Sequence, residues 1–177
     1  TGSADTGSAD TGSADTGSAD SGSGDTGSAD SGDSGTGDTG SASVSIEDIA
    51  EGDLIITEIM IDPSDCTAEP DGEFVEIYNN SASAIDLNGM KFSDKSGSTT
   101  LSDSIIVEAG SYAVGTRTGR TNCYGITADF EFAQGLNNGA GDKASIDNSS
   151  TTIDTVDYQG WTIPSGASIE LSSDAYD

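Results

Sequence analysis

The chain has 177 residues and a formal net charge of −27, from 32 acidic side chains, five basic ones and no histidine. Phosphate backbones are bound by clustered Lys and Arg, so this composition argues against nucleic acid as a direct partner, and anionic membranes would repel the chain. Without histidine a Ser-His-Asp triad cannot be built, and an ordinary zinc site is disfavoured. Cations or cationic surfaces are the natural counterparts of such a charge, although solubility alone also accounts for it.

The first 43 residues are built on a Thr-Gly-Ser-Ala-Asp repeat. They contain eight Asp, no positive charge, no aromatic residue and no aliphatic side chain larger than Ala. Such a segment cannot bury enough apolar surface to offset the ~1–2 kcal/mol per residue that ordering a backbone costs. We therefore predict that residues 1–43 are a disordered acidic linker, a flexible stalk, and that residues 44–177 form one domain.

After a short helical turn expected within residues 44–53, nearly every signal favours β-structure. Runs of β-branched and aromatic residues, separated by turns rich in Gly, Asn, Asp and Ser, predict strands at 54–61, 74–78, 84–87, 90–92, 105–107, 112–114, 129–132, 143–146, 152–158 and 168–171. Asn88-Gly89 is a strong turn signal, and residues 147–150 are typical of a hairpin turn. Val75 and Ile77 share one strand face, which we expect to point into the core. Short strands at this spacing predict an all-β sandwich.

Two features bear on where the protein resides. The sequence opens inside the repeat, so we hypothesise that an export signal, with or without a lipid-anchored cysteine, precedes Thr1. Cys66 and Cys123 lie in polar, loop-like surroundings, and an exported domain would oxidise them to one disulfide bridge. Alternatively, each pairs with a cysteine outside this sequence. No run approaches the ~18 apolar residues of a membrane span, so no transmembrane segment is predicted.

The loop between the first two predicted strands is rich in carboxylates. Calcium prefers six to eight oxygen ligands from carboxylates, carbonyls and water, and this loop is the best candidate to provide them. The alternative is a solvated acidic loop, since the spacing does not match an EF-hand. The candidate ligands are Asp62, Asp65, Glu69, Asp71 and Glu73.

Three other residues are of types used in catalysis or carbohydrate binding, but their positions in the sequence favour structural roles. Glu73 and Glu76 could suggest a pair of catalytic carboxylates, but positions three apart on a strand point to opposite faces. Trp161 could stack on a carbohydrate at the end of the sandwich, although a lone Trp in a small β-domain more often packs in the core or at its rim. We identify no catalytic residues, and the ligand-binding residues stay unknown.

The order of the segments resembles the lamin tail domain, over about residues 54–173. The most specific part is Glu-Phe-Val-Glu-Ile-Tyr-Asn at 73–79, and Ile-Asp-Leu-Asn-Gly-Met-Lys-Phe at 85–92 supports it. The resemblance implies an immunoglobulin-like β-sandwich and no catalytic residues. In the absence of a heptad rod and a basic localisation run, the chain resembles the bacterial exported members. The resemblance also leads us to expect further sequence beyond Asp177, with a final strand missing here.

The resulting hypothesis is a non-enzymatic extracellular or cell-surface module on an acidic stalk, without a cofactor. Its expected partner is a protein, a glycan or an envelope component, and we expect the chain itself to be monomeric. Two alternatives stay open: an accessory domain of a larger secreted hydrolase, and a calcium-stabilised adhesion domain.

Overall fold

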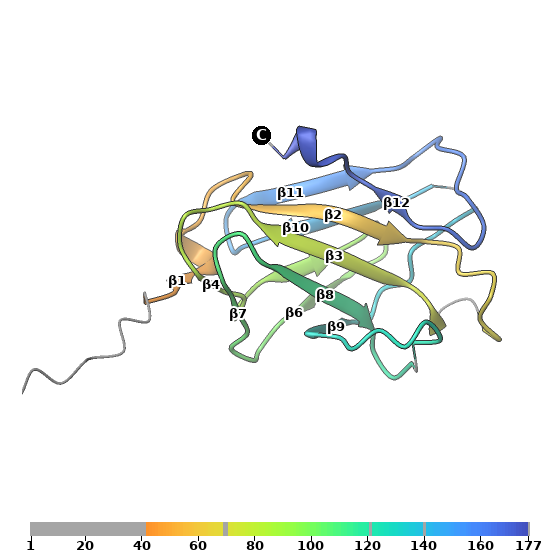
Figure 1. Cartoon of the computed structure of the whole chain (residues 1–177), viewed down its shortest axis with the longest axis horizontal. Coiled ribbons are helices and arrows are strands. Elements are labelled where there is room, and N and C mark those ends of the chain that lie inside the picture. The colour runs from red at the N-terminus through yellow and green to blue at the C-terminus, as the bar shows by residue number, and fades with distance from the viewer. Residues whose placement is uncertain (1–41, 69–70, 121, 140, 177) are drawn as a thin grey trace, which may run out of the picture. The chain divides into compact units, whose positions relative to one another are not determined.

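The computed structural model describes residues 42–68, 71–120, 122–139 and 141–176. In these residues two β-sheets face each other, and a third, smaller sheet lies at one end (Figure 1). Apart from Ala42 and Ser43, the predicted acidic linker lies outside the described residues.

The larger of the two facing sheets has five strands. Their order is β12–β2–β3–β8–β9, and all neighbours are antiparallel except β8 and β9, which are parallel. The five strands are Ile169–Glu170, Leu54–Met60, Phe74–Asn79, Tyr112–Arg117 and Phe130–Phe132. β12 is only two residues long, so it pairs with only part of β2.

The opposite sheet has four antiparallel strands in the order β11–β10–β5–β6. These strands are Thr152–Asp157, Lys143–Asp147, Lys91–Ser93 and Ser98–Thr100. The small third sheet has the order β1–β4–β7, from Val44–Ser45, Ile85–Asp86 and Ile106–Val107. Two 3-10 turns complete the described elements: η1 at Ile46–Asp48 and η3 at Ser173–Ala175.

The core lies between the two larger sheets and follows the two-residue period of the strands. Val75 and Ile77 are fully buried, which confirms the predicted inward face of β3. Phe92 and Phe132, from opposite sheets, meet in the core with their ring centroids 4.6 Å apart. Gly115 in β8 makes room for another core ring, that of Phe130 in β9, since a Cβ atom at this position would clash with it.

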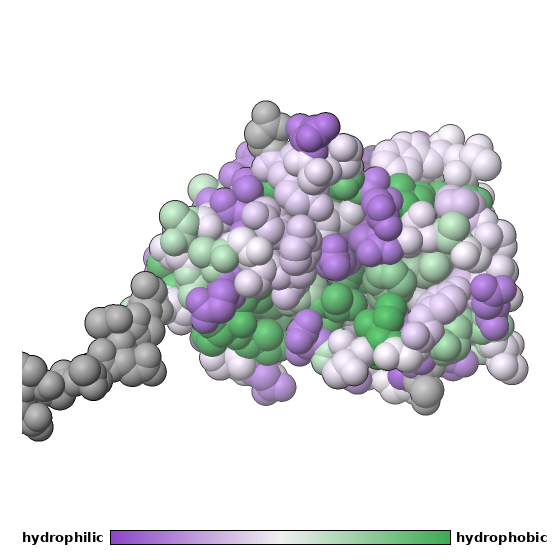
Figure 2. All heavy atoms as spheres, viewed as in Figure 1, coloured by the Kyte–Doolittle hydropathy of each residue, from purple (hydrophilic) through white to green (hydrophobic). Residues whose placement is uncertain are grey.

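The outer face of the five-stranded sheet carries both aromatic and acidic side chains. Tyr78 lies between Tyr112 and Tyr176, with ring centroids 4.9 and 5.1 Å away. Beside these rings, the strand register places Glu170 opposite Glu58. In Figure 2, hydrophobic areas on this side of the molecule are separated by pale and hydrophilic ones.

The structure confirms the predicted all-β, immunoglobulin-like sandwich. The hairpin at residues 147–150 joins β10 and β11, and the short helical turn near the start is η1. Gly89 has a φ of 91°, as the Asn88-Gly89 turn requires, but the strands that it joins, β4 and β5, lie in different sheets. The sequence did not predict β1 or β6, because two- and three-residue polar strands carry too little pattern.

Candidate binding groove

One lateral edge of the sandwich stays open between the two sheets. Here β2 and β11 lie side by side and run in the same direction (Figure 1). A side-chain hydrogen bond links them, because one oxygen of the Asp154 carboxylate in β11 accepts the backbone N–H of Ile56 in β2 at 2.7 Å. The other oxygen accepts the N–H of its own neighbour, Thr155, at 2.7 Å. These bonds satisfy backbone donors where the two sheets share no ladder of backbone hydrogen bonds.

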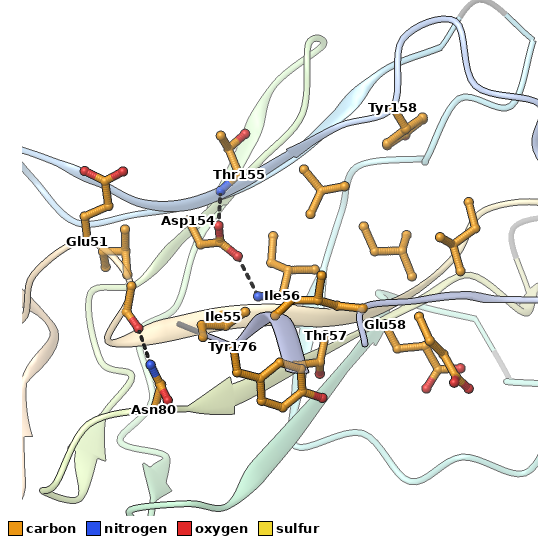
Figure 3. Close-up of a pocket in the computed structure, with 18 of the residues that line it drawn as sticks. Glu51, Ile55, Ile56, Thr57, Glu58, Asn80, Asp154, Thr155, Tyr158 and Tyr176 are labelled. Carbon is orange, nitrogen blue, oxygen red and sulfur yellow. Dashed lines mark hydrogen bonds between the residues drawn. The ribbon is translucent and has the colours of Figure 1, made fainter. Parts of the chain in front are cut away.

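A groove of about 660 Å³ follows this edge (Figure 3). Its floor is apolar, because core side chains of β2 and β11 line it together with Ile55, which the register with Tyr78 places on the outer face of the five-stranded sheet. Around this floor lie β12, the residues after β11, and the last turn, η3. The apolar lining comes from Ile55, Ile56, Ile59, Ile61, Ile153, Val156, Tyr158 and Ile169.

The rim of the groove is acidic. None of the described residues that line it is Lys or Arg. Two large apolar side chains also reach the rim exposed to solvent: Trp161 is 49% exposed and Leu171 is 38% exposed. The rim carboxylates are Glu51, Asp53, Glu58, Asp154 and Glu170.

Four of the five rim carboxylates fall toward the two ends of β2, whereas Asp154 lies between them and is bonded to Ile56. Glu51 and Asp53 precede β2, whereas Glu58 lies near its end and pairs in register with Glu170 of β12. Figure 3 shows Glu51 at one end and Tyr158 toward the other. Like charges directly opposed on neighbouring strands destabilise a sheet, so the Glu58–Glu170 pair favours a cation nearby.

Tyr158 is the largest fully buried side chain of the domain, and it forms part of the groove floor. Burial raises the pKa of its phenol, and the carboxylates of Asp142, Asp94 and Glu73 raise that pKa further. The phenol therefore stays neutral throughout the physiological range. It is a packing group of the floor and does not exchange protons at neutral pH.

The two cysteines predicted to form a bridge are joined in the structure. Cys66 and Cys123 form a disulfide with a Cα–Cα distance of 5.7 Å, and it connects the loop after β2 to the loop after β8. The backbone N–H of Cys123 also donates to the carbonyl of Asp71 at 3.1 Å. Together these bonds hold two long loops against each other at one end of the sandwich.

Two of the candidate calcium ligands pair with different arginines in the structure. Glu73 is 3% exposed and pairs with the guanidinium of Arg117 at 3.3 Å. Asp71 pairs with Arg120 at 3.4 Å. Glu69 lies outside the described residues. Among the residues that the structure describes, no three or more Asp, Glu or Cys side chains gather as a metal site would require, so calcium at this loop stays a prediction.

A thermal melt tests the calcium hypothesis directly. A site of micromolar affinity would stabilise the domain by about 4 kcal/mol in millimolar calcium, which corresponds to a rise of several degrees in Tm. The melt compares EDTA with millimolar calcium at matched ionic strength. A rise that Asp62→Asn and Asp65→Asn abolish would support the site, whereas coincident curves would remove calcium from the description of the loop.

The other residues singled out in the sequence take structural or surface positions. Glu73 is buried, whereas Glu76 is half-buried and accepts a hydrogen bond from the Thr57 hydroxyl at 2.8 Å, so the two carboxylates do not form a catalytic pair. Trp161 lies on the rim of the groove and outside the core. The groove was not predicted from the sequence. The run of isoleucines in β2 was a usable signal, because it is too apolar for a strand with one solvent-facing side.

In the part of the chain that the structure describes, no helix is long and apolar enough to cross a membrane.

Comparison with known proteins identifies the family. No curated protein matches the sequence closely enough to count as a relative. Residues 47–160 match the family described as the Lamin Tail Domain, whose members are immunoglobulin-like domains. This match covers more than half of the chain and agrees with the sandwich described above, so the chain belongs to the lamin tail domain family.

Proposed function

We propose that the chain is a non-catalytic binding or anchoring module, displayed at the cell surface or outside the cell on a flexible acidic stalk. The observation that carries this proposal is the open groove along β2 and β11, with an apolar floor and exposed Trp161 and Leu171 on its rim. Concave, largely apolar sites with a few polar groups are typical binding sites. A chain without histidine lacks the commonest general base, which favours binding over catalysis.

The disulfide supports the proposed location. Disulfides form and persist in oxidising compartments and are rare in the cytosol, so the Cys66–Cys123 bridge suits an exported domain. The acidic repeat suits display, because Gly and Ser are typical of linkers and spaced negative charges repel one another, which increases the distance that a linker spans. A protein, a glycan or an envelope component is then the partner class within reach.

Intact cells that produce the protein provide the test. We expect an antibody to the domain to label these cells without permeabilisation, and added protease to remove the label. We also expect the protein released from these cells to show no free thiol under denaturing conditions. Protection from protease until lysis, together with two reduced cysteines, would overturn the proposed location.

A further inference from the structure

We propose that the groove between β2 and β11 binds an extended segment of another protein in which lysine or arginine side chains flank apolar ones. This inference rests on the proposed function as a binding module and names the chemical class of its partner. Three observations carry it: the apolar floor, the acidic rim and the exposed aromatic side chain at one end.

The apolar lining of the groove favours a ligand with an apolar side chain. Ile59, Ile61 and Ile153 line the groove, and it opens to solvent between the two sheets. Each of these side chains is at most 4% exposed, so the apolar surface open to a ligand comes from other lining residues: Val156 and Ile169 are partly buried, Leu171 is 38% exposed and Trp161 is 49% exposed. A Leu or Val side chain of a ligand that packs against Val156, Ile169 and Leu171 would remove apolar surface from water on both sides, and this burial favours binding.

The acidic rim of the groove favours a ligand with positive charge. Glu58 and Glu170 are directly opposed across β2 and β12, and the described lining residues include no Lys or Arg to compensate them. An arriving ammonium or guanidinium group would replace this repulsion by attraction. Trp161, at 49% exposure, adds an aromatic face on which such a cation can rest.

The spread of the charges favours a peptide over a small amine. Glu51 and Asp53 lie before the start of β2, and Glu58 lies near its end. β2 alone has seven residues, and a strand of that length spans roughly 20 Å. A small amine would reach the carboxylates at one end only, whereas an extended chain reaches both.

Recognition through side chains fits the groove better than addition of a strand. The outward carbonyl of Ile153 already accepts from the N–H of Gly52 at 3.0 Å, and the N–H of Thr155 donates to Asp154. These contacts occupy the outer edge of β11 where a new strand would have to pair. A second copy of this chain is disfavoured as the occupant because each copy carries a net charge of −27.

The experiment titrates the full chain with a synthetic peptide that alternates Lys with Leu, at low ionic strength. Trp161 is the only tryptophan of the sequence, so its emission reports occupancy of the groove without a label. Anisotropy of a labelled peptide gives the Kd. We expect binding that weakens with salt, a shift in the emission of Trp161, and at least tenfold weaker binding of peptides alternating Lys with Ser or Glu with Leu.

Matched charge variants locate the site. We expect Glu58→Gln with Glu170→Gln to weaken the Lys/Leu peptide about tenfold while leaving Tm unchanged or slightly higher, since the two carboxylates repel each other. The control, Glu108→Gln with Glu131→Gln, removes the same charge from exposed positions outside the groove lining and should change the Kd less than twofold.

Several outcomes would overturn the groove proposal. Equal weakening by the two variant pairs would mean that only the overall charge matters, and equal binding of the Lys/Ser peptide would mean that the apolar floor plays no part. Sedimentation that shows dimers dissociated by Glu58→Gln and Trp161→Ala would assign the groove to a second copy. Absence of peptide binding by a chain that is nonetheless exposed on intact cells would remove the groove proposal and leave the binding module in place.

Discussion

Replacing Cys66 and Cys123 together with serine should lower the free energy of unfolding by roughly 4 kcal/mol, because the bridge closes a loop with a sequence separation of 57 residues. The loss comes mainly from the unfolded chain, which gains conformational freedom when the bridge is absent. Urea denaturation of the full chain measures it. The m-value should rise as well, since an unfolded chain without the bridge exposes more surface.

Reduction of the wild-type protein is the control for the serine side chains. It should reproduce both the loss of stability and the higher m-value. A loss of less than about 1 kcal/mol, with an unchanged m-value, would contradict the prediction. That result would mean that the loop after β2 and the loop after β8 stay together in the unfolded ensemble without the bridge.

Replacing Arg117 with methionine should destabilise the domain by about 3 kcal/mol, because it leaves a buried carboxylate without its cation. Glu73 is 3% exposed, and its carboxylate lies 3.3 Å from the Arg117 guanidinium. Methionine keeps most of the apolar length of the arginine side chain, so the loss reports mainly the missing charge. Thermal and urea denaturation at neutral pH measure the effect.

A second arginine of the same domain provides a matched control. Arg120 pairs with Asp71 at 3.4 Å, but its side chain is 45% exposed and that of Asp71 is 27% exposed. Solvent screens such a pair, so Arg120→Met should cost less than about 1 kcal/mol. Equal losses for the two variants would show that burial of Glu73 does not set the cost. Adding Glu73→Gln to Arg117→Met should recover part of the loss.

The strands of the sandwich were largely predictable because their signals are local. In β3 the alternation of Val75 and Ile77 with more polar neighbours identified both the strand and its inner face. The turn at Gly89 was equally evident, since only a few residue types accept its positive φ. These signals do not say which strands pair, and only the structure shows that the turn at Gly89 joins strands of two different sheets.

The candidate calcium loop shows the limit of counting charges along a sequence. Asp71 and Glu73 are two positions apart, yet they pair with Arg120 and Arg117, which are more than forty positions away in the sequence. The run of carboxylates does not reveal that two of the five candidates, Glu73 and Asp71, have arginine partners. The sequence prediction of a metal ion there therefore depends on contacts that the sequence does not display.

The sequence by itself determined the all-β class, the family and the acidic character of the protein, because alternation, turn residues and charge are local properties. Only the tertiary structure decided the site. Glu58 and Glu170 meet because β12 returns to pair with β2. Asp154 bonds Ile56 because the edges of two sheets come together. The physical reason is that a groove is made of long-range packing, and its residues share no spacing along the chain.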